Sequence, residues 1–298
     1  MEKYSSAIIG HISLDRNTDH LGNTVTSMGG AVLYSSAAAH ALGYRVAAVT
    51  KLAPGDEDRL ASLTVPKEDI FALTGESSIA IENVYLTADK ERRTCTCVSE
   101  GTPYTADDVP AGIDANLWHL AGLVYGDFSD GMIEALSERG KVAVDVQGYL
   151  RHADKSTGNM YFENWAEREK LLPYITFLKT DAAEAEILTG LTDRAEAAKA
   201  LFALGAREIM ITHNTEVLVY DGADMFTCPI KSRNLSGRTG RGDTTFAAYI
   251  NERTRFDARH SLLYATALVS AKMEAPGPYK GTREDVEKYI ADFYPEYR

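Results

Sequence analysis

Cysteine, long apolar runs and excess positive charge are all scarce in this chain, and each shortage argues against a class of protein. The 298 residues include only three cysteines, Cys95, Cys97 and Cys228, too few and too irregularly spaced for a disulfide framework or a zinc site. No apolar run approaches the roughly 20 residues of a membrane span. A formal charge of -12 argues against a dedicated binder of nucleic acid or of anionic membranes.

The amino-terminal residues lead into a short strand pattern rather than into the apolar core of a signal peptide. Together with the few cysteines, this pattern predicts a cytoplasmic protein. Hydrophobic residues make up 45% of the chain, enough to bury a sizeable core, and the length suits one large domain over residues 1–298.

Short β-rich runs alternate with helical stretches along most of the chain. This alternation is typical of βαβ units, so we predict an α/β fold with a doubly wound, mostly parallel sheet and helices on both faces. The expected strands are 7–9, 46–49, 117–120, 142–146, 175–178 and 209–211, and the expected helices are 31–42, 183–188, 194–204 and 261–273.

Residues 78–99 break the alternation. Two β-rich runs, 79–86 and 94–98, flank a polar segment, a pattern that predicts a β-hairpin inserted into the domain. We expect one or more strands near residues 11–27 to join it, and the resulting small β structure to act as a lid over the site. Pairing of lid edges would give a homodimer; a strictly monomeric species by light scattering would contradict this expectation.

The most informative segment is the glycine-rich run 236–246. Helical spacing follows it, so the backbone amides of Gly240, Arg241 and Gly242 can converge with the positive helix end on an anion. A carboxylate beside an anion site suits phosphoryl transfer, with Asp243 taking a proton from the attacking hydroxyl. The alternative is that Asp243 only caps the helix.

Polar residues also follow several of the predicted strands, where ligands of open α/β sheets bind. With this series and the Gly-x-Gly-Asp core at 240–243, the chain resembles the ribokinase-like (PfkB) family of ATP-dependent sugar and nucleoside kinases. The resemblance spans nearly the whole chain and implies that Asp243 is the catalytic base and that the 240–242 loop is the anion hole. It also implies a small polyol acceptor (a sugar, nucleoside or inositol), ATP and Mg²⁺; a monovalent cation is a further candidate.

The resemblance implies that Gly29, Gly30 and Asp15 line the acceptor pocket. Many relatives carry asparagine where this chain has Tyr34, so the contact made there differs. The strand exit 145–151 resembles inositol-kinase-like members more than ribokinase itself. We therefore add Gln147 and Arg151 to the expected substrate-binding residues.

For the metal and the donor, the Asn-x-x-Glu motif of the family corresponds to Asp181 and Glu184. A hard cation accepts either oxygen donor, so magnesium handling is expected to survive the change to Asp; a helix-capping pair is the alternative and both roles can coexist. The donor loop, residues 212–217, differs more from the family pattern, because both glycines of the family's Thr-x-Gly-x-x-Gly motif are missing. The donor-binding residues implied are Thr212, Asn214, Lys272 and Gly277.

A different class of function stays open beside the kinase. The altered 212–217 loop makes a non-catalytic sugar or nucleotide sensor on the same fold the main alternative. A Rossmann oxidoreductase is disfavoured because residues 10–14 lack the glycine fingerprint. A metal hydrolase is disfavoured because the seven histidines show no paired ligand spacing.

Overall fold

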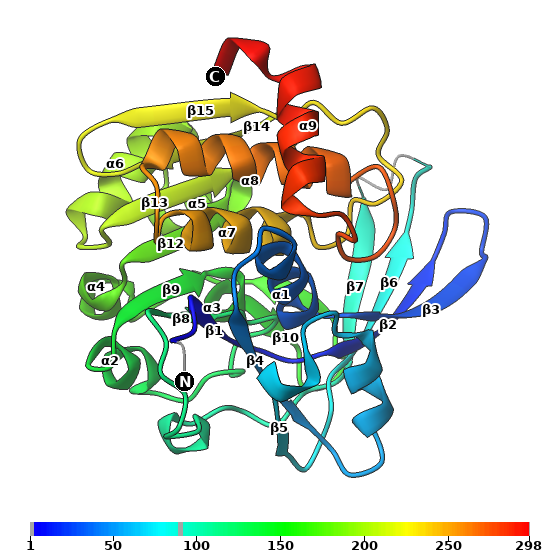
Figure 1. Ribbon diagram of the computed structural model, residues 1–298. Helices are drawn as coiled ribbons and strands as arrows, with labels where there is room; N and C mark the ends of the chain where they lie inside the picture. Colours follow the sequence, from blue (N-terminus) through cyan, green and yellow to red (C-terminus); the bar gives the residue numbers. More distant parts are fainter. Residues whose placement is uncertain (1–2, 89–91, 298) are drawn as a thin grey trace.

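A large mixed sheet forms the centre of the protein, for which a computed structural model describes residues 3–88 and 92–297 (Figure 1). Its strand order, within the described residues, is β15-β14-β13-β12-β9-β8-β1-β4-β5. The strands are β1 (Ser6–Ile9), β4 (Val46–Leu52), β5 (Ile70–Thr74), β8 (Leu117–Leu120), β9 (Lys141–Asp145), β12 (Phe177–Asp181), β13 (Glu208–Thr212), β14 (Glu216–Tyr220) and β15 (Met225–Pro229). Strands β5 to β13 pair in parallel, and β14 and β15 pair antiparallel.

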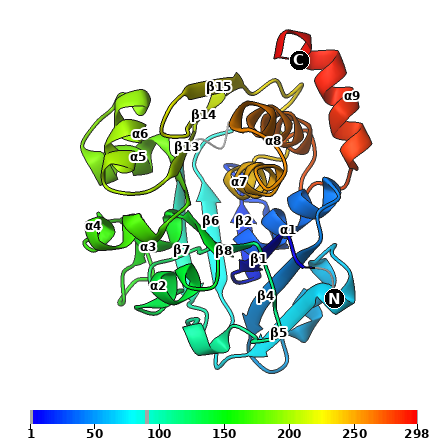
Figure 2. The same cartoon turned by 60° about the vertical axis from the view of Figure 1, so that its left-hand side comes forward.

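Helices cover both faces of this sheet (Figure 2). One face carries α1 (Ala31–Ala41), α7 (Arg241–Glu252) and α8 (Ala258–Lys272), with α9 (Arg283–Phe293) packed on α8. The other face carries α2 (Met132–Ser137), α4 (Arg168–Leu171), α5 (Ala182–Thr189) and α6 (Arg194–Ala203). The predicted doubly wound, mostly parallel sheet is therefore confirmed.

Two apolar cores hold these layers together, one on each face of the sheet. Strands β1 and β4 are buried along their whole length, because a parallel sheet covered on both faces exposes neither side. Side chains alternate between the two cores: Ile8 packs with α1 and α7, whereas Ile9 packs with the cluster under α2, α5 and α6. This burial makes the sheet a rigid platform for the loops at its strand ends.

A small second sheet stands beside the edge of the large one. Its order is β3-β2-β6-β7, from β2 (Ser13–Thr18), β3 (Thr24–Gly29), β6 (Ala80–Tyr85) and β7 (Arg93–Ser99). Strand β2 follows β1 after only three residues, so the small sheet is tied directly to an inner strand of the large sheet. Residues 89–91 of the predicted hairpin lie outside the described residues. Whether this sheet acts as a lid or pairs with a second copy stays a prediction.

A short hairpin and helix complete the architecture near the carboxyl end of β9. Helix α3 (Gln147–Leu150) runs into β10 (Arg151–Ala153), which pairs with β11 (Met160–Phe162). Strand β11 also contacts β7 of the small sheet. In the part of the chain described here, no helix combines the length and apolar character needed to cross a bilayer.

Candidate active site

A cavity of about 410 Å³ lies where the carboxyl ends of the large sheet meet the small sheet. This is the edge at which open α/β sheets bind ligands. The lining includes most of the predicted site residues, namely Asp15, Gly30, Tyr34, Gln147, Arg151, Asp181, Thr212, Asn214 and 240–243. The structure thus brings together residues that are more than 200 positions apart in the sequence.

The glycine-rich loop enters α7 with a left-handed residue at the helix start. Gly240 is the N-cap with φ of 73°, and the cap has no side-chain hydrogen bond. Asp243 lies in the first turn of α7 and is not its cap, so the capping alternative for Asp243 is wrong. The first amides of α7 have no partner within the helix and lie beside a carboxylate that lines the cavity. This arrangement matches the predicted anion hole, whose role stays a prediction.

Two side chains outside the loop fix its shape. The Tyr34 ring lies against Gly240, where an added Cβ would come within 2.2 Å of the ring. The buried Lys272 ammonium donates to the Gly237 carbonyl at 2.6 Å and also to the Thr239 carbonyl. Burial lowers the pKa of Lys272 to about 8. Lys272 is absent from the cavity lining, so the structure places this predicted donor contact behind the loop as an anchor.

The carboxyl of Asp243 is held in an unusual electrostatic environment. Burial, with a further contribution from Asp145, raises its pKa to about 6, while the charge of Lys179 opposes the rise. A pKa between that of an ordinary carboxyl and neutrality is the range that suits a general base.

Sequence reasoning missed Asp145 and Lys179 as a pair beneath this base. The Lys179 ammonium lies 3.0 Å from Asp145 Oδ2 and 3.8 Å from Glu184 Oε2. It is also about 3.1 Å from where a Cβ on Gly242 would lie. A lysine inside an otherwise apolar strand was the available signal, because lysine is almost never fully buried unless it is paired.

Asp181 and Glu184 form a capping box at the start of α5. Asp181 Oδ1 accepts from the Glu184 amide at 2.8 Å, and Glu184 Oε2 accepts from the Asp181 amide at 2.7 Å. Burial raises the pKa of Glu184. The capping alternative is confirmed, and it leaves Asp181 on the cavity surface with Glu184 behind it.

These carboxylates fit a magnesium ion that is shared with a phosphate ligand. Among residues 3–88 and 92–297, no group of three or more His, Cys, Asp or Glu could hold a metal ion. Mg²⁺ does not need such a cage, since it commonly binds through one or two carboxylates, waters and substrate phosphates. The role of Asp181 and Glu184 toward Mg²⁺ stays a prediction.

The opposite end of the cavity is built from β2, α1 and the small sheet. The Asp15 carboxylate accepts from Ser13 Oγ at 2.6 Å, and burial raises its pKa. Gly29 lies directly behind Asp15, where a Cβ would come within 2.1 Å of Oδ2. Gly30 has φ of 103°, and a Cβ there would meet the His11 carbonyl at 2.2 Å. Both glycines therefore allow Asp15 and the α1 start to approach closely.

Besides Asp15, the small sheet contributes six lining residues that sequence reasoning did not select. They are Ser13, Ile81, Asn83, Tyr85, Arg93 and Cys95. Asn83 donates to Asn17 Oδ1 at 3.1 Å, and its own Oδ1 is buried without a partner in the described structure. A buried unpaired acceptor is costly unless a ligand or water satisfies it. Alternation along β6 marks Asn83 as facing the same side as the buried Ile81.

The donor loop that lacks its glycines is a tight connection between β13 and β14. Thr212 pairs with Val217, so Val217 is an ordinary buried strand residue. Asn214 lies at the cavity within 3.5 Å of Arg238. Gly277 does not line the cavity, and nothing lies within 4 Å of the place for its Cβ. Thr212 and Asn214 thus line the cavity, whereas Gly277 does not, and the donor-binding role of the first two stays a prediction.

Residues 2–285 match the family model described as pfkB family carbohydrate kinase. The chain belongs to the pfkB carbohydrate kinase family. It is a phosphotransferase with an alcohol group as acceptor, as predicted, and the ribokinase-like fold is confirmed.

Three relatives show the range of this family. A pyrophosphate-dependent kinase of the ribokinase family, solved with a pyrophosphate analogue and myo-inositol, is 30% identical with a TM-score of 0.85, covering 95% of this chain and 99% of its own. A cytidine kinase from Thermococcus kodakarensis is 26% identical over 258 residues, 82% of this chain and 86% of the relative. Arabidopsis thaliana ribokinase, solved with ribose and ATP, has a TM-score of 0.75 at 15% identity, covering 97% of this chain and 99% of its own, and it shows the fold alone.

Proposed function

We propose that this kinase transfers a phosphoryl group from inorganic pyrophosphate to a hydroxyl of a small cyclic polyol of the inositol class. The observation that carries the proposal is the half-buried carboxyl of Asp243 in the first turn of α7, beside the 240–242 amides in one polar cavity. The base and an anion-binding helix start are then held by the same rigid element, as phosphoryl transfer requires.

In the proposed reaction, Asp243 accepts the proton of the acceptor hydroxyl while its oxygen forms a bond to phosphorus. The bond from that phosphorus to the bridging oxygen of the donor breaks, and inorganic phosphate leaves. The loop amides receive the charge that develops on the transferring group. Mg²⁺, held by Asp181 with Glu184 behind it, would neutralise donor oxygens when bound. Covering of the cavity by the small sheet would keep water from replacing the acceptor.

The donor end of the cavity favours pyrophosphate over the ATP expected from the sequence. Its side chains are polar or cationic apart from Leu235: Thr212, Asn214, Ser236, Arg238, Thr239 and Arg241. Such a lining suits phosphate oxygens better than the apolar face of a nucleobase. Behind it, Gly237 packs directly on the Ala275 carbonyl. The pyrophosphate-dependent relative at 30% identity supports the same choice.

The acceptor end favours a ligand rich in hydroxyl groups. Asp15 offers oxygen acceptors, as does Asn83 Oδ1, which has no partner among the described residues, and Gln147 offers an amide. A cyclic polyol carries donors around its whole rim and can satisfy several of these groups at once. The relative solved with myo-inositol supports this class. A nucleoside, as for the cytidine kinase relative, is the second candidate acceptor.

The proposal is tested by incubating the protein with Mg²⁺ and a matrix of donors and acceptors. The donors are pyrophosphate, ATP and other nucleoside triphosphates; the acceptors are inositols, pentoses, hexoses and nucleosides. Turnover of an inositol with pyrophosphate supports the proposal, and turnover only with ATP contradicts the donor assignment. Binding of a polyol without turnover with any donor would favour a non-catalytic sensor instead.

The pH dependence gives a separate prediction for the base. We expect kcat/KM to rise through a pH of about 6, because Asp243 must lose its proton to act and its pKa is raised to about 6. Asp145→Asn removes a negative charge that raises this pKa and leaves the Lys179 charge less compensated. The measurement is the pH profile of kcat/KM for both proteins. The rising part of this profile should lie at lower pH in the variant than in wild type. A limb that stays in place or moves upward would contradict the assignment.

A further inference from the structure

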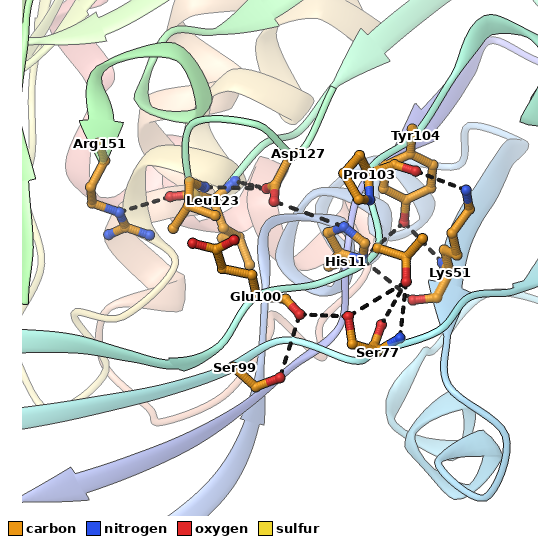
Figure 3. A network of polar contacts seen from close by, with 12 residues as sticks. His11, Lys51, Ser77, Ser99, Glu100, Pro103, Tyr104, Leu123, Asp127 and Arg151 are labelled. Carbon is orange, nitrogen blue, oxygen red and sulfur yellow. Dashed lines mark hydrogen bonds and ion pairs between the residues drawn. The ribbon is translucent and has the colours of Figure 1, made fainter. Parts of the chain in front are cut away.

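Arg151 is the first residue of β10. Its side chain is buried and lines the cavity, and its Nε donates to the Leu123 carbonyl at 2.7 Å (Figure 3). Within the described residues this is its only side-chain hydrogen bond, which leaves both terminal nitrogens available to a ligand. Burial is the main cause of the raised pKa of both Asp15 and Asp243, and the charge of Arg151 lowers both. The charge of the Arg151 guanidinium thus lowers the pKa both of Asp15, at the acceptor end of the cavity, and of Asp243, the proposed base.

The carbonyl that holds Arg151 is itself fixed by Asp127. Asp127 Oδ2 accepts from the Leu123 amide at 2.7 Å and from the Val124 amide at 3.2 Å. The Asp127 amide donates back to the Val124 carbonyl at 3.2 Å, and the Tyr125 amide donates to the Arg151 carbonyl at 2.7 Å. The Asp127 side chain, which is 2% exposed, therefore holds the turn after β8 in shape. This turn is hydrogen-bonded to both the main chain and the side chain of Arg151 in β10.

His11 lies beside the second carboxylate oxygen of Asp127, Oδ1, but makes no hydrogen bond to it. Its Nδ1 lies 3.3 Å from the Lys51 carbonyl and 3.4 Å from the Tyr104 hydroxyl. Its Nε2 lies 3.8 Å from Asp127 Oδ1 and has no hydrogen-bond partner within the described residues. Burial lowers the pKa of His11, which keeps the ring neutral. The two backbone amides, rather than a salt bridge, therefore set the position of Asp127.

We infer that Arg151 contacts the phosphoryl group in transfer and that Asp127 is the positioning residue that holds Arg151 there through the Leu123 carbonyl. This inference rests on the proposed function. The transferring group spreads its charge over three oxygens, and a guanidinium can donate to two of them at once. Such a donor stabilises the transition state only if it is held in place beforehand. Asp127 supplies that constraint without touching a ligand.

The test is a double-mutant cycle on kcat, with Arg151→Ala, Asp127→Ala and the combined variant. Loss of a preorganised donor predicts that Arg151→Ala lowers kcat by about 10²–10³-fold, and loss of positioning predicts about 10–10² for Asp127→Ala. The combined variant should be no slower than Arg151→Ala alone, because Asp127 then has nothing to position. Losses that multiply would overturn the positioning role, and an unchanged kcat in Arg151→Ala would overturn the contact.

Two further variants separate positioning from folding. Asp127→Asn keeps an oxygen that can accept from both amides, so its kcat should stay within about threefold of wild type. Asp69, which lies just before β5 and is as buried as Asp127, is the matched control. Its Oδ1 accepts from the Tyr4 hydroxyl at 2.9 Å and from an Arg45 terminal nitrogen at 2.7 Å. Asp69→Asn should lower the melting temperature but leave kcat unchanged. An Asp127→Asn variant as slow as Asp127→Ala would contradict the inference.

Failure of the proposed function is recognised separately. If wild type transfers phosphate to no acceptor, that function is wrong, and calorimetric binding of pyrophosphate without an acceptor still tests the Arg151 contact. At least tenfold weaker binding in both single variants supports the inference, and unchanged affinity in Arg151→Ala overturns it.

Discussion

Replacing Asp243 by Asn is expected to lower kcat by about 10²–10⁴-fold, the contribution of a positioned general base, with little change in the KM of either substrate. Asn has nearly the same shape but cannot take the proton of the attacking hydroxyl. The measurement is steady-state kinetics with the acceptor identified in the donor and acceptor matrix. A rise in KM with kcat unchanged would instead indicate that Asp243 only binds substrate.

Stability measurements show whether this loss is catalytic. The pKa of Asp243 is raised on folding, so its ionised form destabilises the folded protein at a pH above the folded pKa of about 6. Asn removes that cost, and the variant should melt at the same temperature as wild type or higher. Asp285 is the matched control, since it also lies in the first turn of a helix, α9, but outside the cavity. Asp285→Asn should keep full kcat.

The sequence was sufficient to predict the features that depend on local pattern. The small residues of 31–42 and the periodicity after Asp243 correspond to α1 and α7. Asp15, Arg151 and Asp181, which come at or after the ends of predicted strands, meet in the cavity, because parallel strands bring their carboxyl ends to one edge.

The missed residues depend on contacts between distant segments. Lys179 is separated from Asp145 by 34 positions and reaches it only through β9 and β12 pairing. Asp127 accepts hydrogen bonds from amides only a few positions away. Its effect on Arg151, however, depends on how β8 and β10 lie relative to each other, which the sequence does not show. Lys272 and Gly277 were selected from the C-terminal region that matches the family, and the structure places both outside the lining, since a matching region does not fix where a side chain points.

The second large effect is expected at Gly240, where Ala should lower kcat by about 10²-fold and also destabilise the protein. The residue has φ of 73°, and its Cβ would come within 2.2–2.5 Å of three atoms of the Tyr34 ring. A non-glycine residue in this backbone region costs roughly 1–2 kcal/mol. The ring contact must in addition be relieved by moving Tyr34 or the loop. A shift of about 1 Å in the anion-binding amides is enough for a loss of this size.

Gly190 provides the control that separates the two contributions. It has φ of 74° at the end of α5, and nothing lies within 4 Å of the place for its Cβ. Gly190→Ala therefore carries the backbone strain without the clash and should keep kcat unchanged. Urea unfolding should show a larger loss of stability for Gly240→Ala, with the difference assigned to the contact with Tyr34. Equal losses in the two variants, with full activity in both, would mean that the Tyr34 ring yields freely and that the loop position does not limit the rate.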